Sequence, residues 1–122
     1  MRLHVSQDPL RSQLLKGAMA YLVLAVLNDG ELYGYQIAVR IRERSQGAFA
    51  PSEGSLYPTL HRLEADGALT AAWRAGDRGP RRRWYRITPA GLGMLASHAR
   101  EWEDFRGAVA RVASTLPEAS GA

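Results

Sequence analysis

Arginine side chains, with their positively charged guanidinium groups, are concentrated between positions 74 and 86. This segment has six arginines and one aspartate, a net charge of +5, whereas the whole protein carries +4. Guanidinium groups form forked hydrogen bonds to phosphate and to the edge of guanine. Charge gathered in this way favours a polyanionic partner, and a solvated loop is the alternative. The arginines are Arg74, Arg78, Arg81, Arg82, Arg83 and Arg86.

Catalytic and metal chemistry have little support. The three histidines, His4, His61 and His98, fall in separate predicted elements, and the chain has no cysteine. HExxH, P-loop and GxSxG patterns do not occur. The acidic residues between 101 and 104 are adjacent on a predicted helix and therefore point to different sides. We expect no enzyme, no metal site and no cofactor.

The length and composition favour one intracellular domain. A chain of 122 residues with 46% hydrophobic and 23% charged residues can bury a core without disulfides. The longest apolar run, Ala18 to Leu27, has about half the length that a bilayer span needs. Asp8, Arg11 and Lys16 interrupt any signal-like apolar stretch. We therefore expect a cytoplasmic protein that does not cross a membrane.

Helical periodicity dominates the first half of the chain. After the Asp8-Pro9 cap signal, apolar residues recur at three- and four-residue steps until Leu27. A second helix is expected over 33–46, ended by Gly47, and residues 48–50 form at most a short strand. Ser52 is the predicted N-cap of a third helix with leucines at 56, 60 and 63, which Gly67 ends.

The second half predicts a hairpin and a long helix. Two β-type runs, 68–74 and 82–88, flank a loop rich in Gly and Pro, and their aromatic residues are expected to be core or cross-strand partners. Thr88-Pro89 then begins a helix that runs to about Thr115, before Pro117. This order predicts a mainly α fold with a small β-hairpin: a winged helix-turn-helix domain (1–88), a long C-terminal dimerisation helix (89–116) and a flexible tail (117–122).

The third helix of such a fold enters the major groove of DNA, and the hairpin contacts the backbone. If its leucines face the core, short polar side chains and one arginine remain for bases and phosphates. An ordinary solvated face is the alternative. The outward residues are Ser55, Thr59, His61 and Arg62.

The last helix carries a heptad seam with one polar member, His98. Its residues step by three and four without a break, which indicates a partner helix in a second copy of the chain. Packing on the first helix of the same chain is the alternative. The seam consists of Leu95, His98, Trp102, Phe105, Val109, Val112 and Leu116.

Three segments together resemble the PadR family of bacterial transcriptional regulators. The resemblance spans about Lys16 to Arg111, and its most specific part is the leucine-tyrosine-proline step within the third helix. Tyr33 and Trp84 depart from the family pattern, which usually has histidine and tyrosine there. The segments are Tyr33-Gly34-Tyr35-Gln36-Ile37, Gly54-Ser55-Leu56-Tyr57-Pro58-Thr59-Leu60-His61-Arg62-Leu63-Glu64-Ala65-Asp66-Gly67 and Gly79-Pro80-Arg81-Arg82-Arg83-Trp84-Tyr85-Arg86-Ile87-Thr88.

The resemblance implies a homodimeric repressor that binds an inverted-repeat operator in double-stranded DNA and is released by a small-molecule effector. In multidrug-responsive members of the family, tryptophans near the position of Trp102 sandwich planar aromatic ligands between subunits. The alternative for Trp102 is that it only packs the dimer interface. A winged-helix module that binds proteins is the other functional hypothesis, which the basic hairpin disfavours. The residues expected to contact DNA are Tyr35, Ser52, Ser55, Tyr57, Thr59, His61, Arg62, Arg78, Arg81, Arg82 and Arg83.

Overall fold

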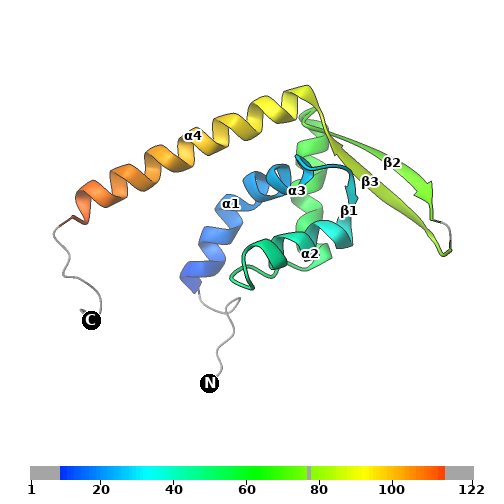
Figure 1. The fold of residues 1–122 in the computed structure, drawn as a ribbon, viewed down its shortest axis with the longest axis horizontal. Coiled ribbons are helices and arrows are strands. Elements are labelled where there is room, and N and C mark those ends of the chain that lie inside the picture. The colour runs from blue at the N-terminus through cyan, green and yellow to red at the C-terminus, as the bar shows by residue number, and fades with distance from the viewer. Residues whose placement is uncertain (1–8, 77, 115–122) are drawn as a thin grey trace, which may run out of the picture.

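The computed structural model describes residues 9–76 and 78–114, and it has the predicted order of helices and hairpin (Figure 1). A three-stranded antiparallel sheet accompanies four helices, which confirms the winged-helix fold class. The elements are α1 (Pro9–Leu27), β1 (Leu32–Tyr33), α2 (Gly34–Arg44), α3 (Glu53–Ala65), β2 (Leu69–Ala75), β3 (Arg81–Ile87) and α4 (Pro89–Val112).

The core lies where α1, α2 and α3 meet the base of the sheet. Val23 and Leu24 of α1 and Ile37 of α2 are fully buried, as are the α3 leucines 56 and 60 and Tyr85 of β3. By length and mean hydropathy alone, α1 satisfies the criteria of a membrane span, as core helices also do. Its contacts with α2, α3, β3 and α4 bury a third of this apolar stretch.

The sheet has the order β1-β3-β2, and the hairpin β2–β3 is called the wing below. Its register runs from Leu69 opposite Ile87 to Ala75 opposite Arg81. The two residues of β1 pair with the other edge of β3. Residues 48–50, for which the sequence allowed at most a short strand, form none, and the Ser45 hydroxyl accepts from the Phe49 amide at 3.0 Å and holds this linker locally.

Capping residues set most helix limits. The Ser52 hydroxyl accepts from the Ser55 amide at 3.1 Å, which confirms the predicted start of α3. Helix α2 begins one residue later than expected, because Tyr33 belongs to β1. It ends two residues earlier, because Gln46 and Gly47 have positive φ angles of 55° and 84°. The Asp8 cap, His4, Leu116, Pro117 and the predicted tail lie outside the described residues.

A close joint connects α3 to α4. The Thr88 hydroxyl donates to the Gly67 carbonyl at 2.6 Å and caps α4 by accepting from the Gly91 amide at 3.0 Å. The Thr88 amide donates to the Ala68 carbonyl at 3.0 Å. A Cβ on Gly91 would lie 2.2 Å from the Ala68 oxygen, so this approach requires glycine. From the joint, α4 runs past α1 and away from the three-helix body (Figure 1).

Candidate nucleic-acid interface

Helix α3 presents a polar side to solvent opposite its buried leucines. The side chains of Ser52, Ser55, His61 and Arg62 are exposed, whereas Thr59 is half-buried. Tyr57 is 45% exposed, and its ring lies 5.2 Å from the ring of His61. The predicted outward face of α3 is therefore accessible along its whole length. Tyr35, from the first turn of α2, is also exposed.

The wing has two faces because side chains alternate along a strand. Tyr85 is buried against the three-helix body, and therefore Arg81 and Arg83 share its face of β3. Arg82 and Trp84 point to the opposite face. Three arginines that are neighbours in sequence thus occupy different surroundings, and Arg78 is exposed in the loop at the tip.

On the face toward α3, Arg83 joins the wing to the helix. Its guanidinium donates to the Glu64 carboxylate at 2.7 Å, and both side chains are only about one-third exposed. Within the described part of the chain, the Arg83 Nε and Tyr85 hydroxyl are buried without a hydrogen-bond partner. Burial raises the pKa of Tyr85. Arg81 is more exposed, with its guanidinium 5.7 Å from the ring centre of Trp73.

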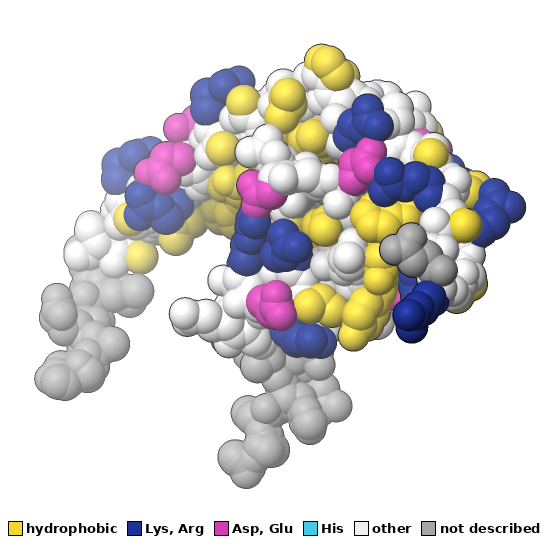
Figure 2. Space-filling model, turned by 45° about the vertical axis from the view of Figure 1, so that its right-hand side comes forward, with side chains coloured by type: hydrophobic (Ala, Val, Ile, Leu, Met, Phe, Trp, Pro, Cys, Tyr) yellow, Lys and Arg dark blue, Asp and Glu magenta, His cyan; other side chains and the backbone are white. Residues whose placement is uncertain are grey.

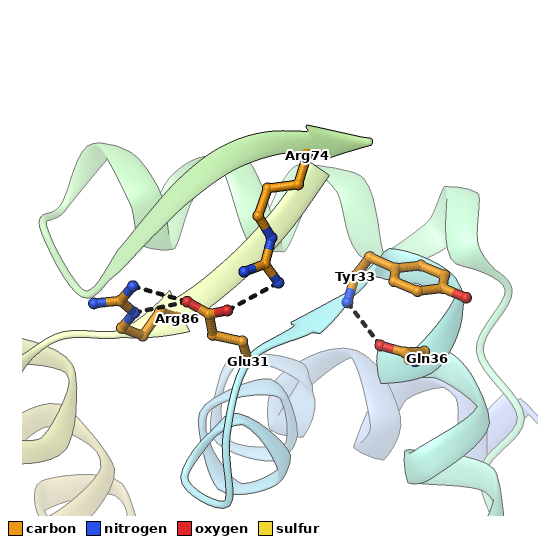
Figure 3. Close-up of polar contacts among 5 residues, drawn as sticks. All are labelled: Glu31, Tyr33, Gln36, Arg74 and Arg86. Carbon is orange, nitrogen blue, oxygen red and sulfur yellow. Dashed lines mark hydrogen bonds and ion pairs between the residues drawn. The ribbon is translucent and has the colours of Figure 1, made fainter. Parts of the chain in front are cut away.

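On the other face, Glu31 holds one arginine from each wing strand (Figure 3). Its carboxylate accepts from Arg86 at 2.8 and 2.9 Å and from Arg74 at 3.0 Å, a group called the Glu31 clasp below. The hydrogen bond from Arg86, followed by the charge of Arg74, lowers the pKa of Glu31 against the opposing effect of burial. The clasp ties Arg86, near the base of the wing, and Arg74, near its tip, to the residue before β1.

Aromatic rings on this second face support the arginines. The Arg74 guanidinium lies 4.2 Å from the ring centre of Trp84, and that of Arg82 lies 4.5 Å from Tyr33. Tyr33 and Trp84 meet edge to face at 5.0 Å. The two positions that depart from the family pattern therefore contact each other. Figure 2 shows the resulting surface, on which arginine side chains alternate with apolar ones over the wing.

Wing and α3 meet in a small cavity. Its volume is about 140 Å³, and it is lined by Glu53, Tyr57 and Leu60 on α3 and by Arg81 and Arg83 on β3, among others. The predicted polar face of α3 and the predicted basic wing are thus brought side by side. Because a duplex presents a groove between two phosphate backbones, a helix with an adjacent basic hairpin matches its shape.

Sequence reasoning missed both carboxylates that hold the wing. Glu31 and Arg86 are 55 residues apart, and Glu64 and Arg83 are 19 residues apart. No local spacing signals either pair, because each depends on the fold to bring its partners together.

The heptad seam of α4 divides into two parts. Leu95 packs against the core, and the Tyr21 ring stacks on His98 at 5.8 Å and on Trp102 at 6.3 Å. The half of the seam nearest the joint therefore packs within the same chain, on α1, as the alternative to a partner helix predicted. The far half is open: Phe105, Val109 and Val112 are 59%, 48% and 85% exposed.

Trp102 lies between two hollows. One, of about 540 Å³, also contacts α1 at Leu14 and Gly17, and the other, of about 370 Å³, contacts Tyr21 and Val109. No group of three or more His, Cys, Asp or Glu residues within 9–76 and 78–114 is placed to hold a metal ion.

Comparisons with known proteins agree with this geometry. Residues 23–97 match the model of the "Transcriptional regulator PadR-like family". The chain is 40% identical over 89 residues to the Mycobacterium tuberculosis transcriptional regulator Rv3488, covering 73% of this chain and 79% of that protein.

Solved structures of PadR-like regulators have the same fold. One from Eggerthella lenta has a TM-score of 0.78 at 27% identity, covering 88% of this chain and 92% of that one. Bacillus subtilis PadR, solved in complex with operator DNA, has a TM-score of 0.59 at 25% identity, covering 66% of this chain and 45% of that one.

Proposed function

Because this chain belongs to the PadR-like family of transcriptional regulators, we propose that it binds an inverted-repeat operator in double-stranded DNA as a homodimer and represses transcription. The observation that carries the proposal is the joint surface of α3 and the wing, where exposed hydrogen-bond donors adjoin arginines. The operator complex of Bacillus subtilis PadR supports the same mode of binding. A regulator acting on DNA in this way works in the cytoplasm, and no catalytic step is part of the proposal.

In this proposal, α3 contacts bases and the wing contacts phosphates. Short hydroxyls and Arg62 on α3 suit the edges of bases, and the exposed guanidiniums of the wing suit backbone oxygens. Arg83 has a double role, since Glu64 already accepts one of its hydrogen bonds. The proposed contacts are those expected from the sequence: Tyr35, Ser52, Ser55, Tyr57, Thr59, His61, Arg62, Arg78, Arg81, Arg82 and Arg83.

The exposed far half of the α4 seam supports the homodimer. Phe105, Val109 and Val112 follow heptad spacing and are open to solvent in one chain, so a second copy can cover them. We assign residues 1–88 to the DNA-binding domain and 89–116 to the dimerisation helix. A two-fold dimer would place its two α3 helices about 34 Å apart, one turn of duplex.

The test is selection of duplexes from random DNA at moderate salt, followed by sedimentation of the best complex. We expect a palindromic sequence and two protomers per site, with much weaker binding to a scrambled duplex. One protomer per site, or equal affinity for the scrambled duplex at physiological salt, would contradict the proposal. Binding to no duplex would favour the alternative of a protein-interaction module.

A planar aromatic effector that releases the operator is the finer part of the proposal. Its support is Trp102, whose indole is flanked by two hollows and stacks with Tyr21. An indole near a two-fold axis offers flat apolar faces to a ligand. Such a ligand changes DNA affinity only if it prefers one arrangement of the two α3 helices, and DNA must then weaken ligand binding by the same factor.

Trp102→Ala separates a pocket from simple packing. If Trp102 lines a pocket, the variant remains dimeric in sedimentation and loses affinity for planar aromatic dyes. If it only packs the interface, the variant dissociates and DNA binding is lost with it. Trp73→Ala is the matched control, because this tryptophan lies on the wing and its loss should leave dye affinity unchanged.

A further inference from the structure

One hollow in the described structure lies between α1 and α3, away from Trp102. Its volume is about 650 Å³. The N-terminal half of α1, the linker after α2 and one side of α3 form its walls. We call it the α1–α3 cavity, and its lining is Arg11, Ser12, Leu15, Lys16, Met19, Ala48, Phe49, Ala50, Pro51, Ser52, Ser55, Pro58, Thr59 and Arg62.

The floor of this cavity is apolar and well supported. Met19 belongs to the buried core, and Leu15 and Phe49 pack against that core. The linker wall is held by Ser45, whose hydroxyl bonds both the amide and the carbonyl of Phe49 at 3.0 and 3.3 Å. A ligand would therefore meet a preformed surface and would not have to order it.

The rim of the α1–α3 cavity is positively charged. Arg11, Lys16 and Arg62 line it, and no carboxylate from the described ranges 9–76 and 78–114 does. Among residues 9–76 and 78–114, neither Lys16 nor Arg62 forms an ion pair. An apolar floor beneath Lys16 and Arg62 selects an anion that carries an apolar body.

We propose that the α1–α3 cavity binds a small organic anion. Its apolar body lies on Leu15, Met19 and Phe49, and its acidic group pairs with Lys16 on the rim that Arg62 also lines. Four lining residues are also proposed DNA contacts, so the ligand and a duplex compete for them directly: Ser52, Ser55, Thr59 and Arg62. The competition rests on the proposed function, whereas binding of the anion does not.

The first experiment measures anion binding to the full chain without DNA. The probes are 2-naphthoate and its uncharged counterpart 2-naphthamide, titrated by calorimetry at pH 7. We expect naphthoate to bind about fivefold more tightly than the amide, the factor given by one partly exposed ion pair. Equal affinities, or no binding of naphthoate, would overturn the proposal.

Variants then locate the bound anion. Lys16→Gln should reduce naphthoate affinity to about that of the amide and leave the affinity of the amide unchanged. Arg100→Gln is the matched control, because this exposed arginine of α4 lies outside the cavity. If Lys16→Gln has no effect and Trp102→Ala abolishes binding, the anion occupies the α4 hollows and the proposal is wrong.

The competition is tested separately with the selected duplex. Naphthoate should weaken DNA binding, and saturating DNA should weaken naphthoate binding by the same factor. If naphthoate binds at Lys16 while DNA affinity stays constant, the competitive part is overturned and the anion site stands. If no duplex binds at all, the proposed function fails, and the calorimetric test of the anion site still decides this inference.

Discussion

Gly91→Ala should disrupt the joint between α3 and α4. The new Cβ would lie 2.2 Å from the Ala68 carbonyl oxygen and 2.7 Å from Ile87 Cγ1, whereas ordinary contact begins at 3.4 Å. The oxygen is a backbone atom that already accepts from the Thr88 amide. It cannot rotate away as a side chain would, so a helix or the end of the wing has to shift.

The magnitude follows from two opposing effects. Overpacking a rigid site costs about 3 kcal/mol, and replacing a helical glycine with alanine returns about 1 kcal/mol. The expected net loss is about 2 kcal/mol in the free energy of unfolding. At about 4 °C per kcal/mol, the melting temperature of Gly91→Ala should fall by about 8 °C.

Gly93→Ala is the matched control in the same helix. A Cβ at this position meets no atom within 4 Å, so only the gain in helix propensity remains and the variant should be more stable by about 1 kcal/mol. Thermal unfolding followed by circular dichroism, at one fixed protomer concentration, compares both variants with the parent protein. A Gly91→Ala protein that melts at or above the parent temperature would refute the steric argument.

Three further predictions concern the wing. Because the folded-state pKa of Glu31 is lowered from 4.5, its contribution to stability is present above that pH and is lost as the pH falls through the lowered pKa. Glu31→Gln should therefore cost about 1 kcal/mol in urea unfolding at pH 7, and a cost that does not shrink as the pH is lowered would contradict this. Arg81→Ala should weaken binding to all duplexes and should reduce by about one unit the slope of the logarithm of the binding constant against the logarithm of the salt concentration. Thr59→Ala should instead alter the preferred DNA sequence. The reverse pattern would show that the wing reads bases and α3 contacts phosphates. The double variant Arg83→Ala with Glu64→Gln should lose less free energy of unfolding than the sum of the two single variants, with a coupling of about 1 kcal/mol in a double-mutant cycle. Strict additivity would show that their ion pair contributes nothing to stability.

Local signals in the sequence were sufficient for most of the fold. Apolar periodicity located the helices, and side-chain caps such as Ser52 and Thr88 fixed where two of them begin. Strand β1 was not predictable in this way, because two residues carry no period and become a strand only beside β3. Residues 48–50 have strand-like composition, yet they form no strand. The Ser45 hydroxyl hydrogen-bonds the backbone amide and carbonyl of Phe49, which would otherwise need a neighbouring strand.

The candidate site shows the same limit. Composition revealed that the wing is basic, but it could not divide the arginines between the two wing faces. Arg83 and Arg86 meet carboxylates that are distant in sequence, whereas Arg81 remains exposed. The seam of α4 was predicted as one surface, and only the fold shows that Tyr21 covers its near half. The α1–α3 cavity has no sequence signature, since its walls come from three separate segments.

The wing leaves and rejoins the helical framework at nearly one point. The hydrogen bond between the Thr88 amide and the Ala68 carbonyl closes its base, and pairing continues from there to Ala75 and Arg81. Its length can therefore change during evolution, or by design, without altering how α4 departs from α3. Each residue added to both strands would extend the ribbon by about 3.4 Å, and additions of two per strand would keep the same side chains toward α3. The length of the wing and the arrangement of the helices can thus change independently of each other.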